Sequence, residues 1–168
     1  MSEGTLLRLA GRVRESIVDG PGLRYTLFAQ GCPHRCPSCQ NPHTWPLEGG
    51  EEIDIDTLRK EILSDSLLRG VTLSGGEPFL QAGVLSLLAQ EVQAAGLDVW
   101  LYSGYTWEEI LASGDPDWLA LLRHTDVLVD GRFVWKQKTY GLRFRGSANQ
   151  RLIDVKLSLE EGELILWE

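Results

Sequence analysis

The chain has 168 residues and a mass of 18.8 kDa, a size that one hydrophobic core can serve, so we expect a single domain over residues 1–168. With 43% hydrophobic and 24% charged residues, its composition is that of a globular protein, which excludes disordered and fibrous classes. The 24 acidic residues outnumber the 16 Lys and Arg residues, and the resulting formal charge of −8 repels polyanions, so we expect no nucleic acid partner.

The first fifteen residues contain charged side chains and no long apolar run, which is not the pattern of a secretory signal. The longest apolar runs of the chain, such as residues 118–122, are far shorter than the roughly 20 residues that cross a bilayer. We therefore expect a cytoplasmic protein with no membrane partner.

The first predicted element is a strand over residues 23–29, which is rich in aromatic and branched side chains. Gly31 and several prolines follow, so we expect the next segment to be a loop. Asp56 predicts the N-cap of an amphipathic helix that ends at Gly70, and a short strand over residues 71–73 comes directly after it.

A second helix is predicted over residues 80–95, where apolar side chains recur at helical spacing, and a strand over residues 97–102 follows it. Thr106 and Glu109 have the spacing of a capping box, which predicts a short third helix. Asp115, followed directly by a proline, is the expected N-cap of a fourth helix.

The last third of the chain predicts a buried strand over residues 127–129, an extended basic loop or hairpin over residues 132–150, and a final strand over residues 152–157. Strands alternate with helices through most of the chain, which predicts an α/β fold with a mostly parallel sheet and helices outside. Since 168 residues are fewer than the ~250 of a closed eight-stranded barrel, we expect a partial or open barrel.

Four loops that follow predicted strands contain residues of chemical interest. In parallel sheets, ligand-binding residues lie on loops after the C-terminal ends of the strands. We therefore expect these loops to meet at one rim, and they contain residues 32–39, 75–77, 103–104 and Asp130.

The three cysteines of the chain, Cys32, Cys36 and Cys39, all lie within eight residues. No other cysteine is available to pair with them, which excludes a disulfide framework and predicts a metal-binding or catalytic cluster in a reducing compartment. Three thiolates are one fewer than a closed zinc site or a fully ligated four-iron cluster needs. Two interpretations follow: an open iron–sulfur site, which the spacing favours, or a structural zinc site with His34 or His43 as fourth ligand.

Residues 32–41, CPHRCPSCQN, resemble the signature of the radical S-adenosylmethionine enzymes, and residues 18–24, VDGPGLR, resemble the segment that precedes it in glycyl-radical enzyme activases. Residues 74–78, SGGEP, are similar to the second motif of that superfamily. Three later blocks resemble those of the activating proteins of anaerobic (class III) ribonucleoside-triphosphate reductases, and they span residues 102–109, 129–134 and 145–151. The resemblance runs in order from about residue 13 to residue 151, and its last block points to this subgroup.

The resemblance implies a partial (β/α) barrel of the radical S-adenosylmethionine type and an oxidoreductase. Cys32, Cys36 and Cys39 would be the catalytic cysteines that hold a 4Fe-4S cluster, with S-adenosylmethionine chelating the fourth iron. An electron from the reduced cluster would cleave this cosubstrate to a 5′-deoxyadenosyl radical, which takes a hydrogen atom from a glycine of the partner reductase. The implied partners are that reductase and a low-potential electron donor such as flavodoxin or ferredoxin.

The resemblance also assigns Gly75, Gly76 and Glu77 to binding of the methionine moiety. Glycines suit this role because the missing Cβ lets the backbone approach a ligand closely. Without the cysteines, the same residues would predict only a turn between a strand and a helix.

Further cosubstrate contacts are expected from Ser38, Cys39, Gln40, Ser103 and Asp130. Many members of the superfamily have an aromatic residue just before the third cysteine, near the adenine. This chain has Ser38 there, as the reductase-activating subgroup generally has a small residue, so we expect main-chain contacts from residues 38–40 instead. Asp130 could equally be a turn residue, and Ser103 is undecided.

Residues 132–151 are locally basic in an acidic protein, with Trp135 and Phe144 between the charges. A solvated surface is the usual explanation, but an apolar centre with a basic rim also suits docking of the reductase, which we favour. Two alternative functions remain. One is an activase of another glycyl-radical enzyme or a small-molecule radical enzyme such as a 7-carboxy-7-deazaguanine synthase, against which residues 145–151 argue. The other is a non-catalytic zinc-binding adaptor.

Overall fold

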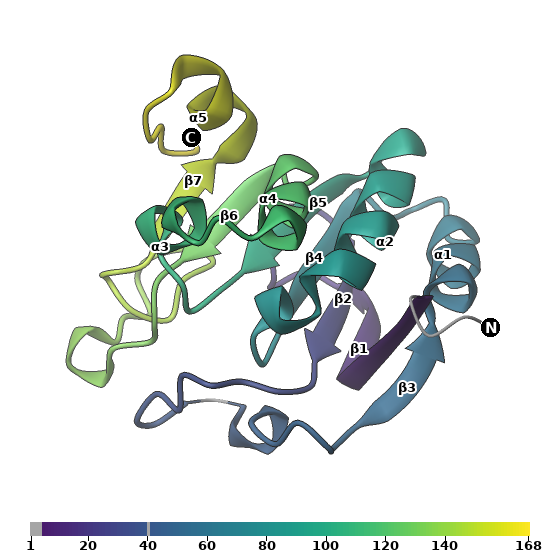
Figure 1. The fold of residues 1–168 in the computed structure, drawn as a ribbon, viewed down its shortest axis with the longest axis horizontal. Coiled ribbons are helices and arrows are strands. Elements are labelled where there is room, and N and C mark those ends of the chain that lie inside the picture. The colour runs from purple at the N-terminus through teal and green to yellow at the C-terminus, as the bar shows by residue number, and fades with distance from the viewer. Residues whose placement is uncertain (1–4, 40) are drawn as a thin grey trace.

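The structure is a computed structural model that describes residues 5–39 and 41–168 (Figure 1). One seven-stranded sheet has the order β3-β1-β2-β4-β5-β6-β7. The strands are β1 (Leu6–Ser16), β2 (Arg24–Ala29), β3 (Glu51–Asp54), β4 (Gly70–Gly75), β5 (Asp98–Tyr102), β6 (Val127–Asp130) and β7 (Arg151–Asp154). The helices are α1 (Ile55–Leu63), α2 (Ala82–Ala94), α3 (Trp107–Ala112), α4 (Pro116–Arg123) and α5 (Val155–Glu161), with short 3-10 turns η2 (Pro42–Thr44), η3 (Pro78–Gln81) and η4 (Trp135–Gln137).

The four central strands, β2, β4, β5 and β6, run parallel, as the alternation of strands and helices predicted. Antiparallel strands extend the sheet on both sides, β1 and β3 beyond β2 and β7 beyond β6. The sheet is open, with β3 at one edge and β7 at the other, and helices pack outside it (Figure 1). The expected fold class, an α/β partial barrel, is confirmed.

The two faces of the sheet differ because side chains alternate along each strand. One face carries the aliphatic residues of the main core, which pack against α1, α2 and α4; examples are Leu27, Leu73, Leu101 and Leu128. The opposite face carries Thr26, Phe28, Ser74 and Tyr102, of which the last three border a cavity. The hydrophobic core thus lies on one side of the sheet and the cavity on the other.

The first half of the chain differs from the prediction at three points. Strands β1 and β3 were not expected, because β1 alternates charged and apolar residues irregularly and pairs with register shifts. Helix α1 is capped by Asp54, not Asp56, since the Asp54 carboxylate accepts from the Asp56 backbone N–H. The helix ends at Leu63, and Gly70, the predicted stop, begins strand β4 instead.

The second half follows the prediction closely until the C-terminus. The capping box of Thr106 and Glu109 is present at α3, and Asp115 caps α4. The expected strand over residues 152–157 is half wrong, because it ends at Asp154, whose side chain accepts from the Leu157 N–H and starts α5. Within the described part of the chain, no helix combines the length and apolar content that crossing a membrane requires.

Candidate active site

A cavity of about 730 Å³ opens at the C-terminal ends of the four parallel strands. The loops after β2, β4, β5 and β6 all contribute to its wall, as the positions of the notable residues predicted. Of the predicted site residues, those that line it are Cys32, Cys36, Cys39, Gly75, Gly76 and Ser103. The structure therefore brings the three cysteines and the glycine pair to one chamber.

The cysteine loop, which we define as residues 30–46, is fastened at its base by backbone hydrogen bonds. The N–H of Gly31 donates to the carbonyl of Thr44 at 2.6 Å, and the N–H of Cys32 donates to the carbonyl of Trp45 at 3.1 Å. The buried Gln30 amide donates to the carbonyl of Pro46 at 2.6 Å. Both ends of the loop are thereby held together, and its three cysteines line the cavity.

The three cysteines are unpaired and partly exposed. Burial raises the pKa of the Cys32 and Cys36 thiols above the ordinary value. A thiol must lose its proton to become an iron or zinc ligand. Metal binding at this loop therefore releases protons.

Gly75 and Gly76 are required by the close approach of another backbone segment. Gly75 has a φ of +99°, and a Cβ there would lie 2.3 Å from the backbone nitrogen of Ala29. A Cβ on Gly76 would lie 2.3 Å from the carbonyl oxygen of Gly31, and the Gly76 N–H donates to the Ala29 carbonyl at 2.8 Å. The glycine pair thus packs directly against the root of the cysteine loop while its open side faces the cavity.

Glu77 is completely buried, and its carboxylate accepts hydrogen bonds from neighbouring loops. His34 Nε2 lies 2.6 Å from Oε1, and the Ser103 hydroxyl donates to both carboxylate oxygens at 2.9 Å. The backbone N–H of Gly104 donates to Oε1 at 2.8 Å. In this arrangement the Glu77 side chain joins protein segments around the cavity, and the predicted methionine contact stays a prediction.

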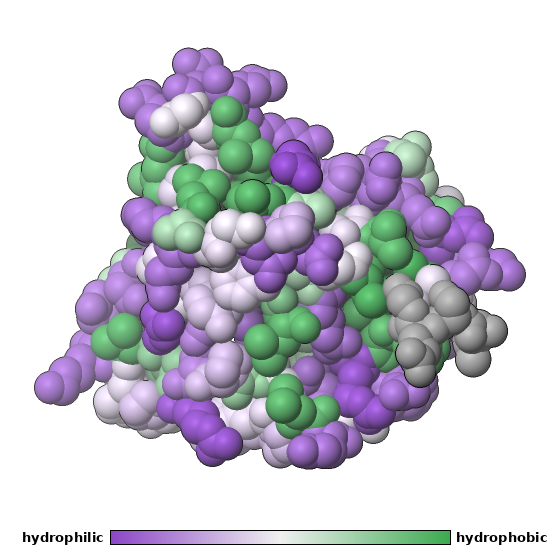
Figure 2. All heavy atoms as spheres, viewed as in Figure 1, coloured by the Kyte–Doolittle hydropathy of each residue, from purple (hydrophilic) through white to green (hydrophobic). Residues whose placement is uncertain are grey.

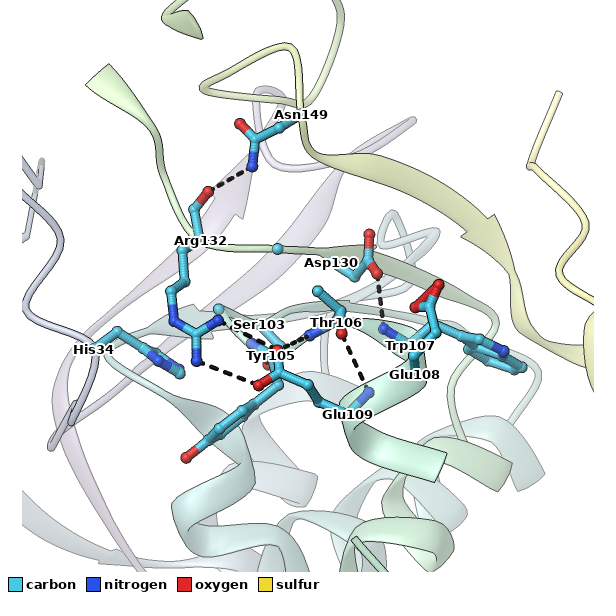
Figure 3. Close-up of polar contacts among 12 residues, drawn as sticks. His34, Ser103, Tyr105, Thr106, Trp107, Glu108, Glu109, Asp130, Arg132 and Asn149 are labelled. Carbon is cyan, nitrogen blue, oxygen red and sulfur yellow. Dashed lines mark hydrogen bonds and ion pairs between the residues drawn. The ribbon is translucent and has the colours of Figure 1, made fainter. Parts of the chain in front are cut away.

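Asp130 is 1% exposed, and its carboxylate is bound by protein donors. It accepts from the Trp107 N–H at 2.8 Å (Figure 3) and from the guanidinium of Arg151 at 2.6 Å, which ties β6 to α3 and β7. Its neighbour Gly131, not Asp130 itself, lines the cavity. Of the remaining predicted contacts, Ser38 is exposed outside the cavity wall, and Gln40 lies outside the described residues.

Among the cavity residues without a predicted role are Asp19 and Tyr102. The Asp19 carboxylate accepts from the hydroxyls of Ser16 at 2.8 Å and Thr26 at 3.1 Å. Burial raises the pKa of Tyr102 above its ordinary value, and the negative charge of Asp19 raises it further. Asp19 belongs to the VDGPGLR segment, whose family resemblance could have indicated that Asp19 lies near the site. The buried guanidinium of Arg24 donates to the Pro21 carbonyl and holds this segment in place.

The donor set fits an iron–sulfur cluster better than a single ion. Among residues 5–39 and 41–168, no three His, Cys, Asp or Glu side chains converge on one ion. Thiolates on a four-iron cluster bind different iron atoms, so they need not converge on one point. Three cysteines that form no disulfide and line one cavity suit that arrangement.

Comparison with known proteins gives the class. Residues 18–153 match the family described as a 4Fe-4S single cluster domain. The chain is similar to the anaerobic ribonucleoside-triphosphate reductase-activating protein of Vibrio cholerae, with 43% identity over 143 residues that cover 80% of this chain and 89% of that protein. The protein of the same name from Escherichia coli is 36% identical, with coverage of 80% and 90%.

A further relative is the pyruvate formate-lyase-activating enzyme of Staphylococcus aureus, which is 34% identical over 89% of this chain and 62% of that enzyme. The fold, the three thiols and these matches define an iron–sulfur protein of the single-cluster class. Within that class, the chain belongs to the family of anaerobic ribonucleoside-triphosphate reductase-activating proteins. The resemblance that the motifs indicated is thereby confirmed.

Proposed function

We propose that this protein activates an anaerobic ribonucleoside-triphosphate reductase by generating a glycyl radical in it. One observation carries the proposal: in a chain of this family, the three free cysteines line the same cavity as Gly75 and Gly76 at the end of strand β4. Cys32, Cys36 and Cys39 would hold the cluster and leave one iron for S-adenosylmethionine. A bound cluster, once reduced by the electron donor, would supply the one electron that breaks the sulfonium carbon–sulfur bond, giving methionine and a 5′-deoxyadenosyl radical able to take a hydrogen atom from the glycine.

The chain itself contributes binding, orientation and shelter from water. A cavity of about 730 Å³ has the size of a small-molecule site. Half-buried aromatic side chains line part of the cavity and would limit access of water to the reacting groups; they are Phe28, Trp45, Tyr102, Phe133 and Phe144. Gly75 and Gly76 border the cavity with their backbone, which a cosubstrate would contact, while the backbone of residues 28–31 fills the space on their Cβ side.

The cavity opens beside the basic loop of residues 132–150, which contributes Lys138, Tyr140 and Arg145 to its wall. Tyr140 is 88% exposed and Trp135 is 53% exposed, so aromatic surface is available next to the cations. Such a surface suits docking of a protein substrate whose glycine must reach the cavity. We further propose a low-potential flavodoxin or ferredoxin as electron donor and the reducing cytoplasm as location, with neither nucleic acid nor a membrane as partner.

The decisive experiment combines metal analysis with radical detection. Anaerobically purified protein should be brown, should contain iron and sulfide, and should cleave S-adenosylmethionine when reduced. Incubated with an anaerobic reductase, it should produce a glycyl radical that electron paramagnetic resonance detects. A colourless protein with one zinc per chain would overturn the proposal.

The similarity to the pyruvate formate-lyase-activating enzyme supports one competing substrate. The same incubation should therefore be run in parallel with a pyruvate formate-lyase. A glycyl radical on the lyase alone would keep the radical chemistry and transfer the assignment to that partner. We expect the radical on the reductase, because the relatives from Vibrio cholerae and Escherichia coli match nearly their whole length.

A further inference from the structure

We propose that His34 and Glu77 form a latch that sets the position of the cysteine loop relative to the glycine pair, and that His34 is a positioning residue, not a metal ligand. The inference rests on the proposed function, because it assigns a role to a side chain within the cluster-binding loop. It goes beyond that function by identifying what holds the three thiols in register with the rest of the cavity.

The first argument is the convergence of three loops on one carboxylate. Glu77 follows β4, His34 follows β2, and Ser103 follows β5. The side chains of His34 and Ser103 both bind the Glu77 carboxylate, at 2.6 Å and 2.9 Å, and Glu77 has no exposed surface. Because a buried carboxylate is costly unless it is hydrogen-bonded, these partners specify the relative positions of all three loops.

The second argument is the slot that receives the imidazole. The His34 side chain is 4% exposed, and its ring meets the edge of Tyr105 with centroids 4.5 Å apart (Figure 3). On another side the slot is closed by Gly104, where an added Cβ would lie 2.4 Å from the Cδ2 atom of His34. The backbone of Gly104 and the ring of Tyr105 thus form a slot for this side chain, with Glu77 at its end.

The third argument concerns the ring nitrogen. The Nε2 atom of His34 lies 2.6 Å from Oε1 of Glu77, so this ring nitrogen is already hydrogen-bonded to the buried carboxyl group. Only Nδ1 is then available to a metal, and among residues 5–39 and 41–168 no three His, Cys, Asp or Glu side chains are placed to hold one ion. For Nε2 to serve as the fourth ligand of a zinc site, the imidazole would have to move away from Glu77. The buried Glu77 side chain would then lose its shortest hydrogen bond.

The fourth argument is strain in the cysteine loop. Arg35 has a φ of 49° and Ser38 has a φ of 60°, a region that residues other than glycine seldom occupy. Such conformations persist when surrounding contacts impose them. His34 supplies one such contact directly beside Arg35, and the Arg35 guanidinium over the Trp45 ring supplies another.

The test uses Gly104→Ala as a wedge that displaces the imidazole without changing His34 or Glu77. Three proteins are compared as full-length chains, Gly104→Ala, His34→Ala and the double variant, with Gly11→Ala as matched control because a Cβ there meets nothing within 4 Å. Two quantities are measured: hydrogen exchange of residues 32–39 in the iron-free protein, and iron bound per chain after anaerobic reconstitution.

We expect faster exchange in the cysteine loop and several-fold less bound iron in each single variant, with wild-type values for Gly11→Ala. The double variant should match His34→Ala alone, because the wedge acts only through the imidazole. Additive effects, or a Gly104→Ala protein that exchanges and binds iron as the wild type does, would overturn the latch.

A conservative replacement separates the latch from ligation and keeps the test valid if His34→Ala folds poorly. His34→Gln retains an N–H donor for Glu77 and should restore slow exchange and most of the bound iron, whereas His34→Leu should not. Loss of iron in His34→Gln with slow exchange retained would mean that His34 is a ligand and would refute the inference. Failure of the wild-type protein to bind iron would instead refute the proposed function, so the two failures are distinguishable.

Discussion

At the scale of single residues, the carboxylates and the thiols at the rim of the sheet differ in how much of their surface is exposed. Glu77 and Asp130 have almost no exposed surface and are bound by protein donors on several sides. The thiols of Cys32, Cys36 and Cys39 are half-buried and have no disulfide partner. The buried carboxylates therefore hold the structure together, whereas the partly exposed cysteines border the cavity, where a ligand can reach them.

Cys36→Ala should abolish the bound cluster and cosubstrate cleavage, because two thiolates cannot hold the cluster with a single open iron. The iron content of reconstituted protein measures the effect. The thermal unfolding of the iron-free variant should equal that of iron-free wild type, since the cysteine lies on a partly exposed loop. Retained iron and cleavage would show that Cys36 is not a ligand.

Gly75→Ala should lower the free energy of unfolding by about 2–5 kcal/mol, from backbone strain together with overpacking. The strain arises because Gly75 has a φ of +99° and a Cβ would clash with the backbone of strand β2. Urea unfolding of iron-free protein measures the loss. Gly11→Ala is the control, and a loss of the same size there would contradict this explanation.

At the scale of elements, the C-terminal segment supports a wall of the cavity. The ring of Trp167 lies 5.0 Å from that of Trp100 on β5, and Trp100 lies 5.1 Å from Phe144 in the basic loop. Trp167 also donates its backbone N–H to the carbonyl of Leu152 on β7. Since Phe144 lines the cavity, the end of the chain is connected to the active site through one aromatic cluster.

Trp167→Ala should lower the free energy of unfolding by about 1–3 kcal/mol, because it removes the ring contacts and opens a gap beside Trp100. Hydrogen exchange should become faster in residues 132–150, where Phe144 loses its support. Leu159→Ala on α5 is the control, since Leu159 is 41% exposed and its truncation should cost little. Unchanged exchange in the loop would contradict the proposed connection.

Arg151 links three elements, since its guanidinium binds Asp130 at the end of β6 and Glu108 on α3. Arg151→Met should lower the free energy of unfolding by about 3–5 kcal/mol, because it leaves the buried Asp130 without its cation. Urea unfolding at neutral pH measures the change. A loss below 1 kcal/mol would show that the Asp130 carboxylate is stabilised by the Trp107 N–H alone.

The ion pair between Arg151 and the exposed Glu108 predicts a pH dependence of the unfolding free energy. Hydrogen bonding to Arg151 lowers the pKa of Glu108 in the folded protein, so the stabilisation is present above the ordinary pKa of a glutamate and is lost as pH falls through the lowered value. Because Glu108 is 63% exposed, Glu108→Gln should cost little at neutral pH. Its unfolding free energy should approach that of wild type in acid.

At the scale of the whole molecule, an acidic chain presents a basic loop at the mouth of its cavity. On the face in Figure 2, apolar residues form separate patches among hydrophilic ones, so no single apolar belt on that face defines an interface. The loop of residues 132–150 instead combines exposed Trp135 and Tyr140 with the cation of Lys138, which lies 4.7 Å and 5.0 Å from their rings.

Lys136→Glu combined with Arg143→Glu should reduce glycyl-radical formation on the reductase several-fold, because both are exposed cations within the docking loop. The loss should shrink as ionic strength rises, since salt screens exposed charges. The rate of radical formation, measured against reductase concentration at two salt concentrations, tests this. Lys60→Glu on α1 is the control, and an equal loss there would indicate a general charge effect.

Local patterns were predictable because neighbours along the chain determine them. The capping box of Thr106 and Glu109, the cap at Asp115 and the parallel strands between glycines and helices all depend on short-range rules. Strand β1 was missed because its stability comes from pairing with both β2 and β3, across intervals that no local pattern encodes. The cap at Asp54 was missed because Asp54 and Asp56 lie only two residues apart and either aspartate suits an N-cap position.

The sequence by itself indicated the kind of site: three cysteines whose spacing predicts an iron–sulfur centre with one open ligand position, and loops that a parallel sheet gathers at one rim. Only the tertiary structure decided which polar groups on that rim remain free. Glu77 is occupied by His34 and Ser103, and Asp130 by Arg151, because burial forces each carboxylate to find donors from other elements. Residue type can be read along the chain, whereas solvent exposure arises only when distant segments pack together.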